Sequence, residues 1–160
     1  MKLTRAGEYA IRSVLYLAGK KDRPVVGRRE IARAMDIPHA FLGKVVQALD
    51  RAGLMVLVQG AKGGCRLARP PAEISMLDVV EAVEGPLFLN ECLARPESCG
   101  RSSICAVHEV WGEARDGFRQ TLREANFEDL ARRDLALGRG TISGNGRGAG
   151  TTSKGLANEG

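Results

Sequence analysis

Three of the chain's four cysteines and one of its two histidines lie within seventeen residues, spaced as Cys92-x6-Cys99-x5-Cys105-x2-His108. The stretch that carries the thiols, ECLARPESCGRSSIC, is polar, so these cysteines are not members of an apolar core. Thiolate and imidazole are the side chains that hold zinc ions and iron-sulfur clusters. The window therefore predicts a metal or cluster site built on a loop, around which the rest of the chain has to fold.

The spacing indicates which group this loop binds. Structural zinc sites usually contain a close pair such as Cys-x2-Cys, whereas gaps of six and five residues suit a loop around a larger cluster. An iron-sulfur cluster is favoured, and zinc stays open. A disulfide framework is disfavoured, because the chain begins MKLTRAGEYA without an apolar signal segment and has no run of about eighteen apolar residues. We expect a cytoplasmic protein with reduced thiols and no contact with a membrane.

Charge divides the chain into segments of opposite sign. Residues 1–70 contain fourteen Lys and Arg against five Asp and Glu, a net charge of +9, whereas residues 71–137 contain seven against thirteen, a net charge of −6. A basic module of this size is typical of a protein that binds a polyanion, and nucleic acid is the first candidate. An ordinary solvated basic surface is the alternative, so the motifs have to decide.

The basic segment reads as a helix-turn-helix. Apolar residues at helical spacing predict an amphipathic helix over residues 4–20 and a short second helix that begins near Arg28. Asp36-Ile37-Pro38 ends the second helix, and Pro38 suits the first turn of a third, which ends at Gly53. The side chains expected to face inward from the third helix are Phe41, Leu42, Val45, Val46 and Leu49.

A hairpin follows the third helix at once. The apolar runs 54–58 and 65–68 are separated by Gly60-Ala61-Lys62-Gly63-Gly64, which predicts two strands and a flexible cationic tip. A helix-turn-helix with such a wing can place its third helix in the major groove of double-stranded DNA. The residues expected to contact DNA are Arg28, His39, Lys44, Gln47 and Lys62. Helix-turn-helix geometry also serves packing alone, but the charge and the wing favour DNA.

Two further helices complete the pattern. Ser75-x-x-Asp78 predicts the amino-terminal cap of a fourth helix, which ends at Gly85 with Leu77, Val80 and Val83 inward. From Cys105 a long helix begins, and its seam at heptad spacing consists of Val107, Trp111, Ala114, Phe118, Thr121 and Ala125. Such a stripe favours pairing with a second copy. We expect a homodimer that binds a palindromic operator, with half-sites about 34 Å apart.

The predicted fold class is mainly α with a small β wing, a winged helix-turn-helix domain plus a long dimerisation helix. Residues 1–85 are expected to form the DNA-binding domain, residues 86–104 the cluster-binding cysteine loop, and residues 105–137 the dimerisation helix and a short terminal helix that packs back. Residues 138–160 hold eight of the twenty glycines, which predicts a disordered tail. No nucleophile, base and orienting group occur together, so we expect no enzyme.

Together these segments resemble the Rrf-two family of iron-sulfur winged-helix regulators, typified by IscR, NsrR and RirA. The likeness covers about residues 1–135 and rests on MKLTRAGEYAIRSVLYLA, IARAMDIPHAFLGKVVQALDRAGL, GAKGGCRLARP, SMLDVVEAVEG and the cysteine window. The resemblance implies a cytoplasmic homodimeric transcription factor with Cys92, Cys99 and Cys105 as thiolate ligands of a two-iron or four-iron cluster. Departures from the family pattern are the gap of six between Cys92 and Cys99, where five is commoner, Gln59 in place of a wing arginine, and Cys65 in place of an aromatic residue.

The resemblance leaves two candidates for the fourth ligand. His108 matches the histidine position of the IscR type, and it lies one helical turn after Cys105. Glu8 sits where the NsrR-like branch has an acidic ligand from the first helix, which the partner chain can supply. A carboxylate or imidazole in place of a fourth thiolate makes a cluster easier to lose, which suits a sensor.

We therefore expect a DNA-binding repressor that senses iron-sulfur status, iron, oxygen or redox state, or nitric oxide. Cluster assembly is expected to tie the cysteine loop to the dimer helix and to alter the spacing of the two recognition helices. A zinc-stabilised or thiol-redox winged-helix regulator is the alternative. A small iron-sulfur electron carrier is less favoured, because the basic module and the wing would have no function in such a protein.

Overall fold

The computed structural model describes residues 3–20, 22–23, 25–60 and 62–138. The chain is mainly helical with one two-stranded antiparallel sheet, which confirms the predicted class. The elements are α1 (Arg5–Ala18), α2 (Arg28–Ala34), α3 (His39–Arg51), β1 (Met55–Val58), β2 (Gly64–Leu67), α4 (Met76–Glu84), α5 (Glu91–Ala94), α6 (Ala106–Glu124) and α7 (Phe127–Ala136), with 3-10 turns at Pro71–Glu73, Pro96–Ser98 and Ser102–Ile104.

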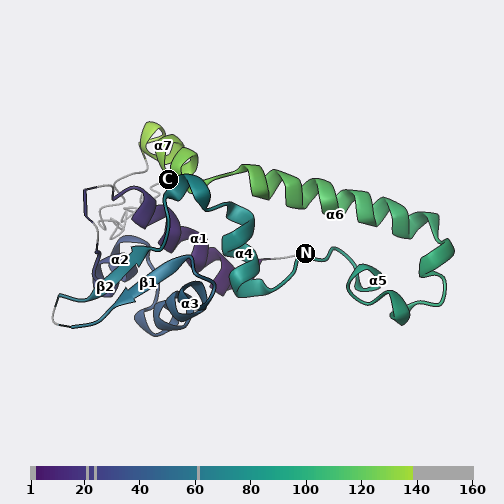
Figure 1. Ribbon diagram of the computed structural model, residues 1–160, viewed down its shortest axis with the longest axis horizontal. Coiled ribbons are helices and arrows are strands. Elements are labelled where there is room, and N and C mark those ends of the chain that lie inside the picture. Colours follow the sequence, from purple (N-terminus) through teal and green to yellow (C-terminus); the bar gives the residue numbers. More distant parts are fainter. Residues whose placement is uncertain (1–2, 21, 24, 61, 139–160) are drawn as a thin grey trace, which may run out of the picture.

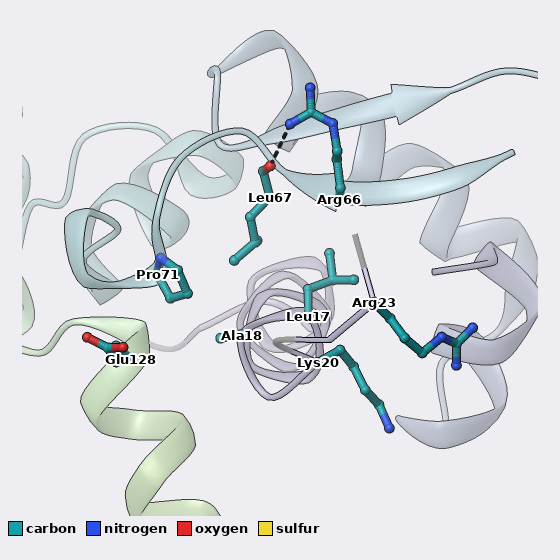
Figure 2. A pocket seen from close by; sticks show the side chains of 8 residues that line it. All are labelled: Leu17, Ala18, Lys20, Arg23, Arg66, Leu67, Pro71 and Glu128. Carbon is teal, nitrogen blue, oxygen red and sulfur yellow. Dashed lines mark hydrogen bonds between the residues drawn. The ribbon is translucent and has the colours of Figure 1, made fainter. Parts of the chain in front are cut away.

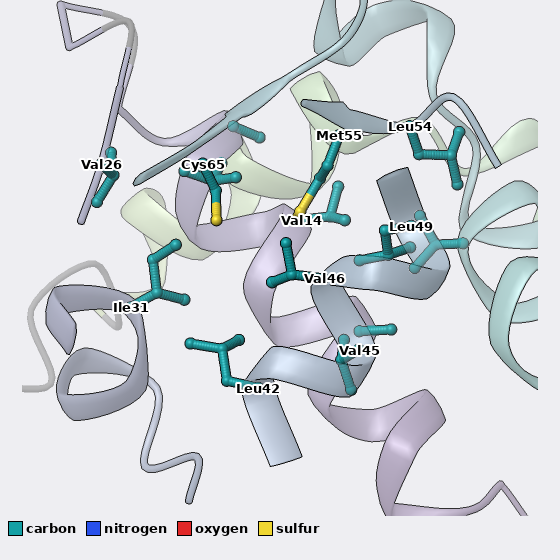
Figure 3. Close-up of a cluster of buried hydrophobic side chains, with 14 of the residues drawn as sticks. Val14, Val26, Ile31, Leu42, Val45, Val46, Leu49, Leu54, Met55 and Cys65 are labelled. Atoms are coloured by element: carbon teal, nitrogen blue, oxygen red, sulfur yellow. The ribbon is translucent and has the colours of Figure 1, made fainter. Parts of the chain in front are cut away.

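The main core lies where α1, α2 and α3 meet the sheet. Figure 3 shows side chains from these helices pointing toward one another, with Met55 and Cys65 of the strands closing the cluster. Residues three and four apart share one face of a helix, so the spacing of the apolar residues decides which side chains are buried. In α3 the buried side chains are Leu42, Val45, Val46 and Leu49, all expected.

One predicted member of that core is wrong. Phe41 is 51% exposed, although we expected its side chain to face inward. The buried stripe of α3 runs through Leu42 and Val45, and Phe41 lies on its flank. There its ring meets the ring of Tyr9 edge-on, with the ring centroids 6.2 Å apart. An apolar residue next to a buried position therefore stays in contact with solvent.

The wing forms as expected, with Val58 opposite Gly64 in the antiparallel pair. Its turn requires glycine, because a Cβ on Gly63 would lie 2.4 Å from the carbonyl oxygen of Val58. The second strand of the wing is fixed to the segment before α2, where Val26 and Cys65 exchange backbone hydrogen bonds of 2.9 and 2.8 Å. Because Cys65 follows Gly64 at the turn end of β2, these bonds hold the wing near its turn to the segment before α2.

The fourth helix begins and ends where its sequence predicts. The Ser75 hydroxyl accepts a hydrogen bond from the Asp78 N–H at 3.1 Å, and the Asp78 carboxylate accepts one from the Ser75 N–H at 3.0 Å. This reciprocal pair is a capping box. Gly85 ends the helix with a φ of +79°. The buried or half-buried side chains of α4 include the expected Leu77, Val80 and Val83, and also Val79.

After α4 the chain leaves this winged-helix body, and it returns to the body along the long helix α6. In Figure 1, α6 extends beyond the body, with α5 at its far end. None of the residues of α6 is buried. Beyond α6 the chain rejoins the body: the Met76 N–H donates to the Ala125 carbonyl at 2.8 Å, and the Phe127 N–H donates to the Ile74 carbonyl at 3.0 Å. Helix α7 then packs against α1 with Phe127 fully buried, as expected for the last helix.

Two expectations concern the remainder of the chain. The predicted disordered tail, residues 138–160, lies outside the described residues from position 139 onward. Gly138, the last described residue, adopts a φ of +69° after α7. No helix in the described part of the chain has both the length and the apolar character needed to cross a bilayer.

Candidate functional site

The five residues expected to contact DNA are all exposed. Arg28 begins α2, Lys62 lies in the wing tip, and the outer face of α3 carries His39, Lys44 and Gln47. Figure 1 shows α3 beside the strands of the wing. A helix and a cationic loop tip are thus available to one duplex, which is the arrangement that winged helices use.

Glu30 anchors the start of α2. Its carboxylate accepts two hydrogen bonds from the Arg23 guanidinium, at 2.8 and 2.9 Å, and one from the Tyr16 hydroxyl at 2.9 Å. The bonds from Arg23 lower the pKa of Glu30, whereas burial, together with the bond to Glu30, raises the pKa of Tyr16. This network ties α2 to α1 and fixes the turn from which Arg28 projects. The sequence did not reveal it, because the three positions, although seven residues apart, lie on two helices and the loop between them rather than on one helix.

The cysteine loop is built from short turns. Cys92 lies in α5, Cys99 follows the 3-10 turn Pro96–Ser98, and Cys105 is the N-cap residue of α6. The Cys99 carbonyl accepts hydrogen bonds from the N–H and the hydroxyl of Ser102, at 3.1 and 3.0 Å. All the cysteines are free thiols, Cys99 being exposed and Cys92 and Cys105 half-buried. The three thiols of the loop are therefore accessible for binding a metal or a cluster.

His108 supplies a further donor in the first turn of α6. Its backbone N–H donates to the Cys105 carbonyl at 3.0 Å. Its side-chain Nδ1 is buried and has no hydrogen-bond partner among the described residues. A buried polar atom left unpaired costs free energy, and neutral imidazole commonly binds metal. Three thiols and this nitrogen form a donor set that fits zinc or an iron-sulfur cluster.

The single chain does not assemble these donors. Among the described residues, no three Cys, His, Asp or Glu side chains lie close enough to share a metal ion. Glu8, the other expected ligand, lies in the first turn of α1, 3.8 Å from the Arg5 guanidinium. Figure 1 places α1 in the winged-helix body and α5 at the far end of α6. Within one chain, Glu8 and the cysteine loop are therefore separate.

Helix α6 has two unlike faces. The half-buried side, turned toward the rest of the chain, carries His108, Gly112, Arg115, Arg119 and Leu122. The predicted seam lies on an adjacent face, about 100° around the helix. There Val107, Trp111 and Phe118 are 62%, 39% and 37% exposed. A row of large apolar side chains in contact with water is a feature of interaction surfaces. The exposed seam is therefore a candidate contact with another protein chain.

Cys65 is set apart from the other cysteines. It is fully buried in β2 within the main core, and burial raises its pKa to about 11. A thiol in this state is a poor nucleophile and a poor ligand, because both roles need the thiolate. Its surroundings agree with the expectation of a small apolar strand residue.

A hollow of about 390 Å³ lies between α1, β2 and α7, as Figure 2 shows. Its apolar lining consists of Leu17, Ala18, Leu67 and Pro71. The cationic residues at its rim are Lys20, Arg23 and Arg66. In Figure 2 the charged ends of Lys20 and Arg23 point to one side, away from the hollow, and that of Arg66 points in another direction. Because these charges do not converge, the hollow offers no cationic centre for an anionic ligand.

Comparisons with known proteins extend these observations. The Rrf2 family model, described as an iron-dependent transcriptional regulator, matches residues 3–133. The chain is similar to Protein aau3 of Rhizobium meliloti, with 35% identity over 82% of this chain and 86% of that protein. It is also similar to the HTH-type transcriptional regulator NsrR of Geobacillus kaustophilus, with 34% identity over 81% of this chain and 89% of that protein. Among solved structures, CymR, the global cysteine regulator of B. subtilis, has a TM-score of 0.70 at 28% identity, covering 83% of this chain and 98% of CymR.

Proposed function

Because the chain belongs to the Rrf2 family of transcriptional regulators, we propose that it is a homodimeric, DNA-binding repressor whose cysteine loop holds an iron-sulfur cluster. One observation carries the proposal: the Nδ1 of His108, which has no hydrogen-bond partner among the described residues, lies one helical turn after Cys105, next to a loop whose cysteines are all free. We place the protein in the cytoplasm, where thiols stay reduced.

DNA binding follows from the exposed face of α3 and the wing. In the proposed complex α3 enters the major groove, with His39, Lys44 and Gln47 toward the bases and backbone. Lys62 reaches the backbone or the minor groove from the wing tip, and Arg28 contacts phosphate from the start of α2. The +9 charge of residues 1–70 supplies the long-range attraction to the polyanion.

The homodimer uses the exposed seam of α6. When two copies of this seam pair, the apolar side chains of Val107, Trp111 and Phe118 are removed from water. None of these three positions would bury a charge. A two-fold pair presents two copies of α3, which suits a palindromic operator with half-sites about 34 Å apart.

The proposed cluster ligands are Cys92, Cys99 and Cys105, with the fourth ligand coming from His108 or from Glu8 of the second copy. When bound, an iron-sulfur cluster supplies a redox-active centre that oxygen, nitric oxide or iron shortage can alter or remove. The three cysteines then hold the loop against the start of α6, and their release frees it. We propose that this change in the loop alters operator affinity by shifting the population of dimer conformations.

The decisive test begins with anaerobic purification of the full chain. Visible absorption together with iron and sulfide analysis should show a cluster, and Cys105→Ala should abolish it. Operator affinity should differ before and after cluster removal.

Colourless, iron-free protein even after anaerobic reconstitution would contradict the proposal. Bound zinc in that material would instead support the zinc-stabilised regulator, and operator binding that changes only on thiol oxidation would support the thiol-redox regulator.

A further inference from the structure

Glu81, in the second half of α4, contacts the segment that leads into the cysteine loop and the long helix that follows the loop. Its Oε1 accepts a hydrogen bond from the backbone N–H of Leu87 at 3.1 Å, just after α4 ends. The Arg119 guanidinium of α6 donates to both Glu81 oxygens, with a distance of 3.3 Å between Nη2 and Oε2. The Glu81 carboxylate therefore connects the start of the cysteine loop, at Leu87, to α6, along which the chain returns to the winged-helix body.

The surroundings of this contact make it stronger than an ordinary surface ion pair. The Glu81 and Arg119 side chains are 25% and 26% exposed, so salt and water screen the pair only partly. A guanidinium that grips both oxygens of a carboxylate also fixes the geometry of the pair. Leu87 is buried beside the contact in a small apolar cluster, against which Leu122 of α6 packs. The contact therefore acts as one joint between α4, the start of the loop and α6.

This joint lies on the physical route from the cysteines to the DNA-binding face. Between Cys105 and Arg119, α6 is one unbroken helix of about 21 Å, calculated from the rise per residue. A displacement at the start of the helix therefore reaches Arg119 with little loss. From the joint, α4 packs directly against both α1 and α3.

We propose that Glu81 is a positioning residue that couples the state of the cysteine loop to the orientation of α3. The inference rests on the proposed function, since it needs a loop that changes state and a face that binds DNA. While the ion pair between Glu81 and Arg119 is formed, α6 and α4 move together. Without this ion pair α6 moves independently of α4, and a change in the cysteine loop no longer alters the orientation of α3.

The test measures operator dissociation constants anaerobically, for the cluster-reconstituted and the chelator-treated full-length protein. The ratio of the two constants is the coupling. In Glu81→Gln and Arg119→Gln we expect the iron content, sulfide content and absorption spectrum of wild type. The ratio of the two dissociation constants should be at least about fivefold closer to one than in wild type, a change within the usual range of allosteric couplings. Asp116→Asn is the matched control, because Asp116 pairs with Arg115 on the same helix at 2.8 Å and should leave the ratio unchanged.

A second measurement needs no cluster. Amide hydrogen exchange at Leu87 in the chelator-treated protein should be faster in Glu81→Ala, which removes the acceptor, than in Glu81→Gln, which keeps one. If Arg119→Gln does not fold, Arg119→Lys takes its place, and its ratio should be closer to one than that of wild type, because the fork-shaped contact is lost.

The outcomes separate the two proposals. A wild-type ratio that persists in the Glu81 and Arg119 variants, with their clusters intact, overturns the coupling role and leaves the proposed function standing. A wild-type protein that binds no cluster, or whose ratio is one, contradicts the proposed function itself.

Discussion

Glu84, the last residue of α4, accepts hydrogen bonds from both the backbone N–H and the hydroxyl of Thr4, eighty residues earlier in the chain. Thr4 is also the N-cap of α1, and its hydroxyl accepts a hydrogen bond from the Gly7 N–H at 3.3 Å. The end of α4 thus holds the start of the helix that carries Glu8. A Cβ on Gly7 would lie 2.5 Å from Oε1 of Glu84, so glycine provides the room for this contact.

Gly7→Ala should destabilise the wild-type protein, because displacing Glu84 outweighs the gain in helix propensity of about 1 kcal/mol. In a Glu84→Ala background the same substitution should be stabilising, by about 0.5–1 kcal/mol, since only the Leu3 side chain then has to move. Urea denaturation of the four proteins measures both effects. An effect of the same sign in both backgrounds would contradict the proposed role of glycine at this position.

Lys44→Ala should weaken operator binding and lower the slope of log affinity against log salt by about 1, because one phosphate contact is lost. Fluorescence anisotropy at several salt concentrations measures the slope. Arg123→Ala, an exposed cation of α6, is the control and should leave the slope unchanged. An unchanged slope in Lys44→Ala would mean that Lys44 does not contact the phosphate backbone.

Trp111 reports on the proposed dimer, because it is the chain's one tryptophan and its side chain is 39% exposed on the seam of α6. Dilution should shift its emission to the red as the dimer dissociates. Phe118→Asp should raise the dimer dissociation constant by at least about a hundredfold, since it buries an unpaired charge at the seam. Sedimentation velocity measures this, with Arg123→Asp as the control. A dimer of unchanged affinity in Phe118→Asp would exclude this seam as the interface.

Native, metal-free protein should react with iodoacetamide at three cysteines near pH 8. Cys92, Cys99 and Cys105 should be modified, whereas Cys65 should react only after unfolding, because it is fully buried and its pKa is raised to about 11. Peptide mass mapping identifies the modified thiols. Rapid modification of Cys65 in folded protein would show that the wing opens from the core.

The same thiol should make the fold sensitive to alkali. The pKa of Cys65 rises from 9.0 to about 11 on folding, so the folded state keeps its proton where the unfolded state loses it. Stability from this group is therefore complete below about pH 9 and is lost as the pH rises toward 11, by up to about 3 kcal/mol. Chemical denaturation of wild type and Cys65→Ala from pH 8 to 10.5 should show a difference that shrinks with pH. A constant difference would contradict the shift.

Local patterns predicted local structure well. The capping box of Ser75 and Asp78 involves residues three apart, and the wing follows from glycines between two apolar runs, so both could be read directly. Phe41 was misplaced because it adjoins a buried position, and periodicity alone does not resolve the edge of a stripe. Whether an apolar side chain at that edge is covered depends on the neighbouring helix, which no local pattern describes.

Contacts across the fold were beyond prediction. Glu81 and Arg119 are thirty-eight residues apart, and the bonds of Glu30 to Tyr16 and Arg23 depend on how two helices cross. Neither set lies within one helix or strand, so the spacing of its residues does not indicate that they are in contact. The cysteine window did identify the loop that carries the metal-binding donors. The arrangement of these donors depends on the cofactor and on the partner chain, which residue spacing does not reveal.

The burial of Phe127 has a consequence for how this protein is made. Its ring is fully buried among helices from the first half of the chain, yet it follows the cysteine loop and the long helix in the sequence. On the ribosome, the amino-terminal half must wait for the last helix to emerge before its interior closes. A nascent chain halted before residue 127 should still be open to proteases, although every residue proposed to touch DNA has already been synthesised.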